Sequence, residues 1–324
     1  MPEPRNAPAQ LKSMRDLEYR LGVDRNQLRL LAGRWRDEYF PFQQAKRPKP
    51  HAKIKKEGKL RQIDNPSRKL KQVQTRILDR ILPPVLPEFL FGAVPGWGIK
   101  DHAEKHLGAN TVVKMDIKDY YPSITSKHIY SVWSSTLHCS PPIASLLTKL
   151  TTYNWHLPQG APTSPAIANL FLASIYGPVL NECEAKGVTV TAWVDDLIFS
   201  GENARSVMEL VRKSLALSGL KLSSSKKEIL GPRQSKTVTG VRLGANQLRA
   251  PSKSLRNLRA GIHNLRSGRY TERGREADVA SITGQIAHVR FICPADGERL
   301  EYAFKAECPA PRLRDVGTPP RMLK

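Results

Sequence analysis

A pair of adjacent aspartates between two strand-forming segments constrains this chain more than any other feature. Asp195 and Asp196 belong to the stretch 193–196 (WVDD), which lies between the segment 188–192 (VTVTA) and the segment 197–200 (LIFS). The β-branched and apolar content of both segments predicts two strands, with the acidic pair at the tip of a hairpin. Neighbouring carboxylates repel one another unless a cation lies between them. An isolated Asp-Asp pair is more often an ordinary turn, so other segments of the chain have to decide.

The charge of the chain indicates a polyanionic partner. Its 324 residues include 52 Lys and Arg against 29 Asp and Glu, which gives a net charge of +23. This excess favours nucleic acid over a membrane surface. No apolar run is long enough to span a membrane and the N-terminus has no apolar signal core, so we expect a cytoplasmic protein with no membrane partner. The cysteines lack metal-ligand spacing and are expected to be reduced thiols: Cys139, Cys183, Cys293 and Cys308.

The N-terminal part of the chain predicts helices, a basic linker and a hairpin. Apolar residues at helical spacing predict helices over residues 8–40, before a basic, proline-containing linker. A hairpin is expected over residues 52–64, with its turn at Glu57-Gly58. A further helix is expected over residues 66–82, with Pro66 at its first position and Asn65 as its cap.

The remainder of the chain alternates strands and helices before it becomes mostly helical. Residues 112–117 form a short apolar segment that predicts a strand with a carboxylate near its end. Residues 162–184 are the longest helical candidate, and residues 206–217 predict another helix. Residues 237–243 predict a strand, and from Ser252 onward we expect helices with a strongly basic face.

Three carboxylates in these segments suggest phosphoryl-transfer chemistry. Asp116 lies at a strand end, and Asp195 and Asp196 lie at a hairpin tip. If the two segments are neighbours in one sheet, the three acids converge on one point. Two divalent ions roughly 4 Å apart would then activate an attacking hydroxyl and stabilise a leaving phosphate oxygen. Hard ions with oxygen ligands fit this set, so we expect two Mg²⁺ ions, for which Mn²⁺ can substitute.

The segments that carry these acids resemble the motifs of reverse transcriptases. Residues 116–124 (DIKDYYPSI) resemble motif A, residues 157–165 (LPQGAPTSP) resemble motif B, and residues 193–196 (WVDD) resemble motif C. They occur in the order and spacing of that family. Residues 59–66 (KLRQIDNP) resemble the fingers segment that precedes them. The resemblance covers most of residues 50–300.

This resemblance implies an α+β, right-hand polymerase fold. It has fingers, a palm of antiparallel sheet plus helices, and a helical thumb. N-terminal helices and the basic linker would occupy residues 1–50, the fingers 51–110, and the palm, with finger insertions, 111–245. The thumb would occupy residues 246–308, and the Pro-rich residues 309–324 are expected to be a disordered tail.

Within the family, the chain resembles the bacterial retron enzymes in its compact length. Val238-Thr239-Gly240 matches a triplet of retron enzymes, whereas Ala103 and His106 match only part of their Asn-Ala-x-x-His motif, because the motif's Asn is replaced by His102. No maturase or endonuclease extension is expected after the thumb. The resemblance implies a cognate structured noncoding RNA, priming from an RNA 2′-hydroxyl, a covalent RNA–DNA product (msDNA) and a role in anti-phage defence with an effector protein.

Two alternatives remain open from the sequence. One is another bacterial reverse transcriptase, of the group II intron, diversity-generating or abortive-infection type. The other is a non-catalytic RNA-binding relative that retains the fold without the chemistry. Intact Asp116, Asp195 and Asp196 argue against the second alternative.

The resemblance also implies contacts to an incoming deoxynucleoside triphosphate. Tyr121 stands where the family places an aromatic gate that collides with a ribose 2′-hydroxyl, although Tyr120 competes for that position. Gln159 lies on the loop before the long helix and would touch the nucleotide. Arg61, with Lys55 or Lys56, would bind the triphosphate, since an Arg side chain offers a bidentate fork.

Further basic and aromatic positions are expected to act on the leaving group and the nucleic acid. Lys226 resembles the motif D lysine that protonates departing pyrophosphate, with Lys227 adjacent to it. Trp193 replaces the usual Tyr of motif C, and we expect it to affect primer alignment. A basic helical stripe in the thumb is expected to track nucleic-acid phosphates; it includes Arg249, Lys253, Arg256, Arg259 and Arg266.

Overall fold

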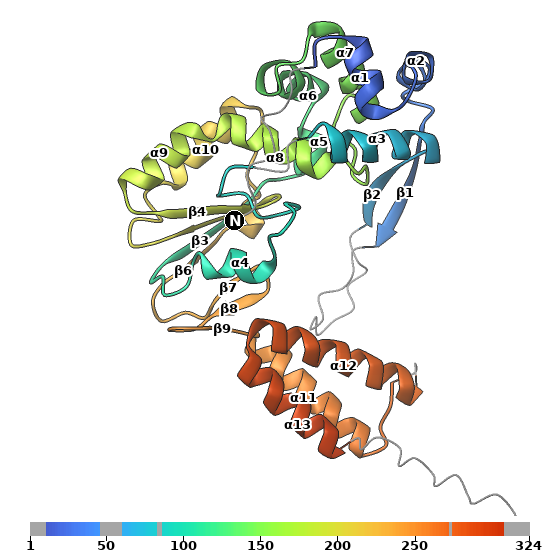
Figure 1. The fold of residues 1–324 in the computed structure, drawn as a ribbon. Helices are drawn as coiled ribbons and strands as arrows, with labels where there is room; N and C mark the ends of the chain where they lie inside the picture. The colour runs from blue at the N-terminus through green and yellow to red at the C-terminus, as the bar shows by residue number, and fades with distance from the viewer. Residues whose placement is uncertain (1–10, 46–59, 83–85, 272–273, 308–324) are drawn as a thin grey trace, which may run out of the picture. The chain divides into compact units, whose positions relative to one another are not determined.

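The computed structural model describes residues 11–45, 60–82, 86–271 and 274–307. The chain divides into two units, residues 1–239 and residues 240–324. Figure 1 shows a mixed α/β first unit and a second unit dominated by helices. The mixture of helices and antiparallel sheets agrees with the expected α+β class.

A four-stranded antiparallel sheet forms the centre of the first unit. Its strand order is β4 (Thr189–Trp193), β5 (Asp196–Ser200), β3 (Val112–Asp116) and β6 (Glu228–Leu230). The hairpin expected around the acidic pair is confirmed, because β4 and β5 pair antiparallel. The strand expected at 112–117 is β3, and it pairs with β5. The acidic hairpin and the Asp116 strand are therefore direct neighbours.

The pairing register gives the sheet one apolar and one polar face. Val113, Ala192, Leu197 and Phe199 belong to the main hydrophobic core. Side chains alternate along a strand, so the opposite face carries Thr191, Trp193, Ser200, Asp116 and Asp196. Figure 1 shows α9 (Gly177–Ala185) and α10 (Met208–Leu217) on one side of the sheet and α4 (Ile99–Glu104) on the other.

A second, two-stranded sheet corrects the prediction for the N-terminal region. Residues 8–40 were expected to be helical, but β1 (Tyr39–Ala45) begins inside that range and pairs with β2 (Leu60–Pro66). Pro41 fits this strand because β1 is itself an edge strand of a two-stranded sheet. The expected strand at 52–56 and its turn lie outside the described residues.

The helix after β2 starts later than expected. Asn65 and Pro66 are the last residues of β2, and α3 (Arg68–Arg80) begins after Ser67. The Ser67 hydroxyl accepts a hydrogen bond from the Leu70 amide at 3.1 Å, which caps the helix. The expected cap at Asn65 was wrong because that residue is engaged in strand pairing with Phe40.

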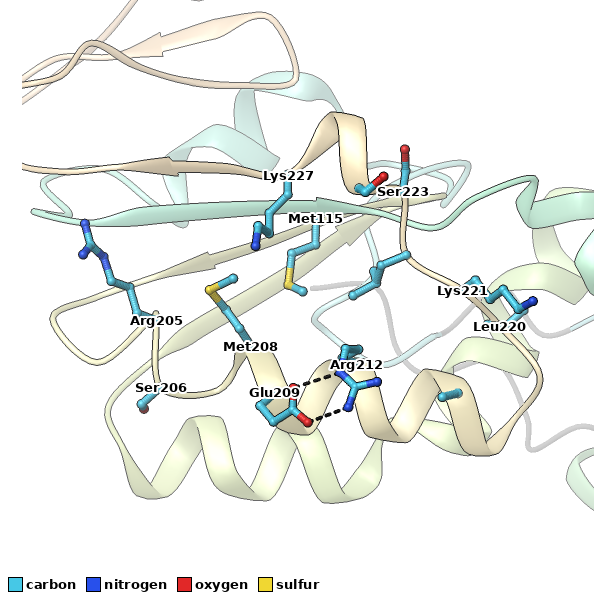
Figure 2. Close-up of a pocket in the computed structure, with 13 residues that line it drawn as sticks. Met115, Arg205, Ser206, Met208, Glu209, Arg212, Leu220, Lys221, Ser223 and Lys227 are labelled. Carbon is cyan, nitrogen blue, oxygen red and sulfur yellow. Dashed lines mark hydrogen bonds and ion pairs between the residues drawn. The ribbon is translucent and has the colours of Figure 1, made fainter.

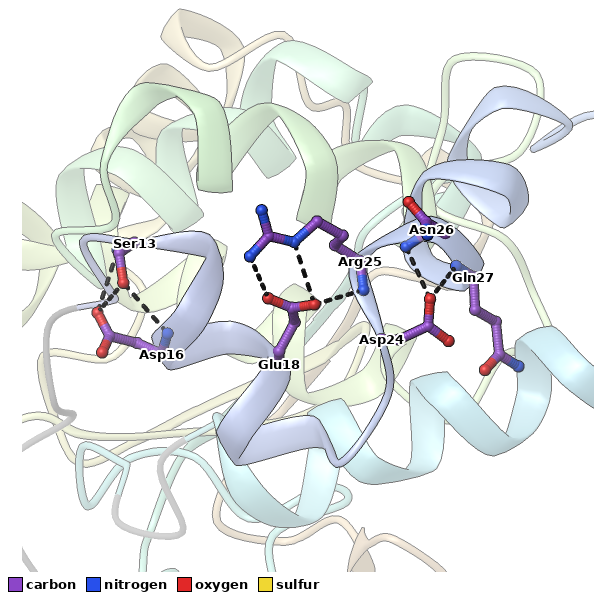
Figure 3. A network of polar contacts seen from close by, with 7 residues as sticks. All are labelled: Ser13, Asp16, Glu18, Asp24, Arg25, Asn26 and Gln27. Atoms are coloured by element: carbon purple, nitrogen blue, oxygen red, sulfur yellow. Dashed lines mark hydrogen bonds and ion pairs between the residues drawn. The ribbon is translucent and has the colours of Figure 1, made fainter.

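The first two helices are fixed by polar contacts at their ends (Figure 3). Ser13 and Asp16 form a reciprocal capping box at the start of α1 (Met14–Leu21). Asp24 accepts from two backbone amides at the start of α2 (Arg25–Gly33). Glu18 of α1 binds Arg25 through a backbone bond of 2.7 Å and an ion pair of 3.1 Å. The contact between Glu18 and Arg25 ties the start of α2 to α1.

The long helix expected at 162–184 is two helices. α8 (Ser164–Ile175) ends before Gly177, where α9 begins with a proline in its first turn. Pro178 has no backbone N–H to donate to the preceding turn, and its ring clashes with the carbonyl four residues earlier. A helix therefore does not continue through this position, and a new helix starts here. The strand expected at 237–243 is likewise two strands, β7 (Lys236–Val238) and β8 (Val241–Leu243).

Several short elements complete the first unit. They are α5 (Tyr120–Ser123), α6 (Ser126–Ser131), the π-helical turn η1 (Val132–Thr136), α7 (Pro141–Thr151) and the 3₁₀ turn η2 (Ser224–Lys226). The buried Trp133 and Tyr176 are among the largest side chains of this core. Because the apolar side chains of β3, β4 and β5 pack into this core, it holds in place the strands whose opposite face is polar.

The second unit is a three-helix arrangement with its own core. β8 pairs with β9 (Leu248–Arg249), and α11 (Ser252–Arg266), α12 (Gly274–Ile292) and α13 (Pro294–Glu307) follow. A Cβ at Gly297 would lie 2.3 Å from the Cα of Arg290, so α13 approaches α12 at a distance that only glycine permits. The core consists of Ala250, Leu258, Ile262, Leu265, Ile282, Ile286, Val289 and Leu300.

The described helices and cysteines bear on the predictions about membrane spans and free thiols. None of the described helices is both long and apolar enough to cross a membrane. Cys139, Cys183 and Cys293 are buried free thiols, as expected, and Cys308 lies outside the described residues.

Candidate active site

The structure brings Asp116 against Asp196. They are directly paired residues at the ends of β3 and β5, so their side chains project from the same face of the sheet. The Ile117 amide donates to the Asp195 carbonyl at 2.9 Å, which continues the strand pairing into the turn. Segments separated by about eighty positions in the sequence thus place three carboxylic acids at one end of the sheet.

The turn that carries the acidic pair has an unfavourable backbone conformation. Val194 has φ of 59°, in the left-handed region that a β-branched residue rarely adopts. Gly92 makes this turn possible, because a Cβ there would lie 2.5 Å from the Val194 nitrogen. The Phe91 amide also donates to the Ala192 carbonyl at 2.9 Å. The segment 89–92 therefore packs directly under the turn.

Burial and, after it, mutual repulsion raise the pKa values of the two aspartates at the turn. Asp116 is buried, Asp195 is half-buried and Asp196 is exposed. Burial and then the charge of Asp116 raise the pKa of Asp195. Desolvation of the Asp196 carboxyl and the charges of Asp195 and Asp116 raise its pKa to about 6. A cation bound among these groups would remove the repulsion.

Lys226 already supplies one positive charge to this cluster. Its Nζ lies 2.5 Å from Oδ2 of Asp116. Partial desolvation lowers the Lys226 pKa, but the hydrogen bond to Asp116 and the nearby aspartates outweigh it and raise the pKa overall. The Ser223 amide donates to the Asp116 carbonyl at 2.8 Å, which fixes the segment before Lys226 beside β3. Lys226 is therefore protonated and within reach of the acids.

The donor set suits hard divalent ions. Its carboxylate oxygens are ligands that Mg²⁺ and Mn²⁺ prefer, and the Lys226 ammonium shows that a cation is stabilised at this position. As the side chains stand, no three His, Cys, Asp or Glu groups in the described part of the chain are arranged to hold a metal. Release of Asp116 from Lys226 would free its carboxylate for an ion.

The structure distinguishes the two tyrosines of the motif A segment. Tyr120 is buried in the core, and its hydroxyl donates to the Ala168 carbonyl of α8 at 2.8 Å. Tyr121 is half-buried, and its pKa is raised to about 12 by burial and then by the charge of Asp195, against the effect of Arg61. Tyr120 is thus buried and hydrogen-bonded within the core, whereas Tyr121 is partly exposed and close enough to Asp195 and Arg61 for their charges to affect its pKa.

The loop that carries Gln159 is held by β2. The Asp64 amide donates to the Gln159 carbonyl at 2.8 Å, and the Gln159 amide donates to the Asp64 carboxylate at 3.2 Å. His156 lies 3.5 Å from the same carboxylate. Gly160 has φ of 129°, and a Cβ there would lie 2.9 Å from Ile63. Sequence reasoning missed the role of Asp64, because its partners His156 and Gln159 are distant in the chain.

Comparison with known proteins decides the family. Residues 49–243 match the family "Reverse transcriptase (RNA-dependent DNA polymerase)". The chain belongs to the reverse transcriptases. The family implies the right-hand polymerase fold and activity as an RNA-directed DNA polymerase.

Curated relatives identify the retron branch. Retron Ec86 reverse transcriptase of Escherichia coli is 31% identical over 256 residues, which cover 78% of each chain. Retron Mx65 reverse transcriptase of Myxococcus xanthus is 30% identical, over 76% of this chain and 61% of the relative. Retron Ec48 reverse transcriptase of E. coli is 26% identical, over 96% of this chain and 79% of the relative. This chain is therefore a retron-type reverse transcriptase.

The basic residues expected around the nucleotide are only partly visible. Arg61 lies on β2, opposite Gln44, and its charge lowers the pKa of both Tyr121 and Asp195. Lys55 and Lys56 lie outside the described residues. Arg61 is thus the one of these three candidates that the structure places beside the acids of the reverse transcriptase.

The basic stripe of the second unit follows one side of α11. Lys253, Arg256, Arg259 and Arg266 are exposed, whereas Leu258, Ile262 and Leu265 are buried. Arg249 differs from the others because it is half-buried on β9 and its guanidinium lies 3.8 Å from Asp296. The helix therefore carries positive charge on its exposed side and apolar residues on its buried side.

A cavity of about 650 Å³ lies on the other face of the central sheet (Figure 2). Met115 of β3 and Met208 of α10 contribute apolar walls, and Lys227 lines it too. Met115 alternates with Asp116 along the strand, so this cavity and the aspartates lie on opposite faces. The two adjacent lysines are separated in the same way: Lys226 binds Asp116 and Lys227 lines the cavity.

Proposed function

We propose that this reverse transcriptase extends DNA at the end of the sheet where Asp116, Asp195 and Asp196 converge. These aspartates would hold two Mg²⁺ ions, with Mn²⁺ as a substitute. When bound, the ions would lower the pKa of the attacking hydroxyl and neutralise charge on the phosphates. The observation that carries the proposal is the register that pairs Asp116 with Asp196.

The side chains around the aspartates have separate roles in this proposal. Arg61 binds the triphosphate, with a lysine of the basic segment at 55–56. Tyr121 excludes a ribose 2′-hydroxyl, and Gln159 contacts the nucleotide from a loop fixed by Asp64. Lys226 donates its proton to the departing pyrophosphate. It suits this role because its raised pKa keeps it protonated and because it lies beside Asp116.

The nucleic acid is proposed to follow the cationic side of α11. Exposed cations on one helical face neutralise phosphates without reading sequence. We assign Lys253, Arg256, Arg259 and Arg266 to this contact, with Arg249 at its start. Trp193 is proposed to align the primer beside Asp196, with which it pairs across the hairpin.

The biological substrate is proposed to be a structured noncoding RNA. By analogy with retron enzymes, synthesis starts from a 2′-hydroxyl of that RNA and yields branched RNA–DNA, which serves cytoplasmic anti-phage defence with an effector protein. Sequencing of nucleic acid that co-purifies with the protein tests this proposal. A covalent RNA–DNA hybrid is expected; recovery of RNA without attached DNA from cells in which the enzyme is active would contradict it.

A further inference from the structure

A buried histidine pair lies on the polar face of the central sheet, behind the acidic hairpin. His102 and His106 of the α4 region are fully buried. His102 bonds Thr239 through Nδ1, and its Nε2 lies 2.6 Å from the Thr191 hydroxyl. His106 bonds the same Thr191 hydroxyl at 2.7 Å and the Ser200 hydroxyl at 2.7 Å. All four ring nitrogens of the pair are therefore engaged.

The hydrogen-bond pattern can be satisfied with both rings neutral. If the single proton of the Thr191 hydroxyl is donated to one histidine, that ring must be neutral, and Thr191 accepts from the other histidine. With two neutral rings, each histidine donates from one nitrogen and accepts at the other along the chain Thr239–His102–Thr191–His106–Ser200. Burial lowers the pKa of His102 to about 4 and that of His106 to about 3, which agrees with neutral rings.

His102 also stacks on two aromatic rings. The centroid of its ring lies 5.1 Å from that of Phe91, with 30° between the planes. It also lies 5.5 Å from the centroid of Trp193, with 26° between the planes. The hydrogen bonds at both edges prevent the imidazole from rotating, so it offers Trp193 a fixed surface.

Trp193 links the fixed imidazole of His102 to the turn that carries the aspartates. It pairs directly with Asp196 across the hairpin, and the next residue is the strained Val194. A strained turn persists only where its surroundings hold it in place. Phe91 supports the turn twice, through its backbone amide to Ala192 and through its ring against His102. The stack Phe91–His102–Trp193 is the side-chain part of that support.

Positions 102 and 193, which both depart from the motifs that this chain resembles, are in contact with each other. His102 replaces an expected Asn and Trp193 replaces an expected Tyr. An Asn amide has no ring to stack on an indole. We propose that His102 is a positioning residue for the Asp195–Asp196 turn, that it acts through Trp193, and that positions 102 and 193 form a coupled pair. The proposal rests on the polymerase site assigned above.

A double-mutant cycle tests this coupling. The four proteins are wild type, H102N, W193Y and H102N/W193Y, and the readouts are kcat and KM for single dNTP incorporation and the misincorporation ratio. We expect H102N to lower kcat about tenfold with little change in KM, since it misplaces the turn. The loss in the double variant should be at least about fivefold smaller than the product of the single losses.

A second cycle separates positioning from folding. Thr239→Val keeps the side-chain shape but removes the hydroxyl at Nδ1 of His102. It should lower kcat in the wild-type background and have no further effect in the H102N background. Thermal unfolding of every variant shows whether it is folded at the assay temperature. His138→Asn, at an exposed histidine, is the matched control and should leave kcat unchanged.

Two outcomes would overturn the proposal. One is that the losses of H102N and W193Y multiply to within about twofold of the double variant's loss. The other is that H102N or T239V lowers the unfolding temperature while kcat and misincorporation stay at the wild-type values. Incorporation by the wild-type protein is measured in the same assay, so failure of the coupling is distinguishable from failure of the polymerase assignment.

Discussion

Lys226 Nζ lies 2.5 Å from Oδ2 of Asp116, while the next residue, Lys227, lines a cavity on the opposite face of the sheet. The sequence alone left these two lysines as alternatives for the proton donor. The two lysines therefore have different environments, and substitutions at positions 226 and 227 form a matched pair of variants.

We expect Lys226→Gln to lower kcat by about a hundredfold or more, because a neutral amide cannot protonate pyrophosphate. Lys227→Gln should leave kcat unchanged. Single-turnover dNTP incorporation measures both, with primer–template affinity determined in parallel. Equal kcat values for the two variants would contradict the assignment.

Tyr121→Ala should weaken discrimination against ribonucleotides. Removal of the half-buried ring leaves space for a 2′-hydroxyl, so the ratio of kcat/KM for dNTP to that for rNTP is expected to fall about tenfold or more. Tyr120→Phe is the control. It removes the hydrogen bond to Ala168, so it should lower the free energy of unfolding by about 1 kcal/mol. Unchanged discrimination in Tyr121→Ala would contradict the role of Tyr121 as the gate.

The His156–Asp64 pair should make stability depend on pH. The hydrogen bond to Asp64 raises the His156 pKa above its ordinary 6.5, so this contribution is complete below 6.5 and is lost as pH rises through the folded value. Desolvation opposes the shift of Asp64, but its hydrogen bonds to His156, Gln62 and Gln159 lower its pKa below 3.8. Its contribution is present above 3.8 and is lost as pH falls through the folded value.

The pair therefore contributes most between about pH 4 and 6.5. We expect His156→Gln to lower the free energy of unfolding there by on the order of 1 kcal/mol, with a smaller difference at pH 8. Denaturant unfolding across this range measures it. A difference that grows from pH 6 to pH 8 would contradict an upward shift of the His156 pKa on folding.

Removal of two cations from α11 should change the salt dependence of nucleic-acid binding. We expect R256Q/R259Q to reduce the slope of log K against log salt concentration by about two. R290Q/K305Q removes the same charge from the second unit, but both of these side chains bind Glu301. This control should change the slope less. Equal slopes for the two double variants would contradict a contact between α11 and the nucleic-acid phosphates.

The local pattern of the sequence predicted the elements that carry the motifs. The alternation and β-branched content around Asp195 predicted the hairpin that β4 and β5 form. The boundary between α8 and α9 was missed because the apolar spacing continues across Pro178. The strand β1 was missed because its partner, β2, follows an intervening segment and helical spacing alone cannot reveal such a pairing.

The supporting residues of the site were harder to foresee than the acids. Asp64 fixes the Gln159 loop across ninety-five positions of sequence, and His102 bonds Thr239 across 137. Neither residue belongs to a local pattern that indicates its partner. Their roles follow only from the packing of the first unit, which brings those segments together.

The convergence of the three aspartates is tested most directly by Asp195→Asn in primer extension with Mg²⁺, dNTPs and an RNA template. Asn keeps the size of the side chain but removes its charge, so extension should fall below about one-hundredth of the wild-type rate while primer–template binding is retained. Extension by the variant at the wild-type rate would contradict the role of these aspartates in the reaction.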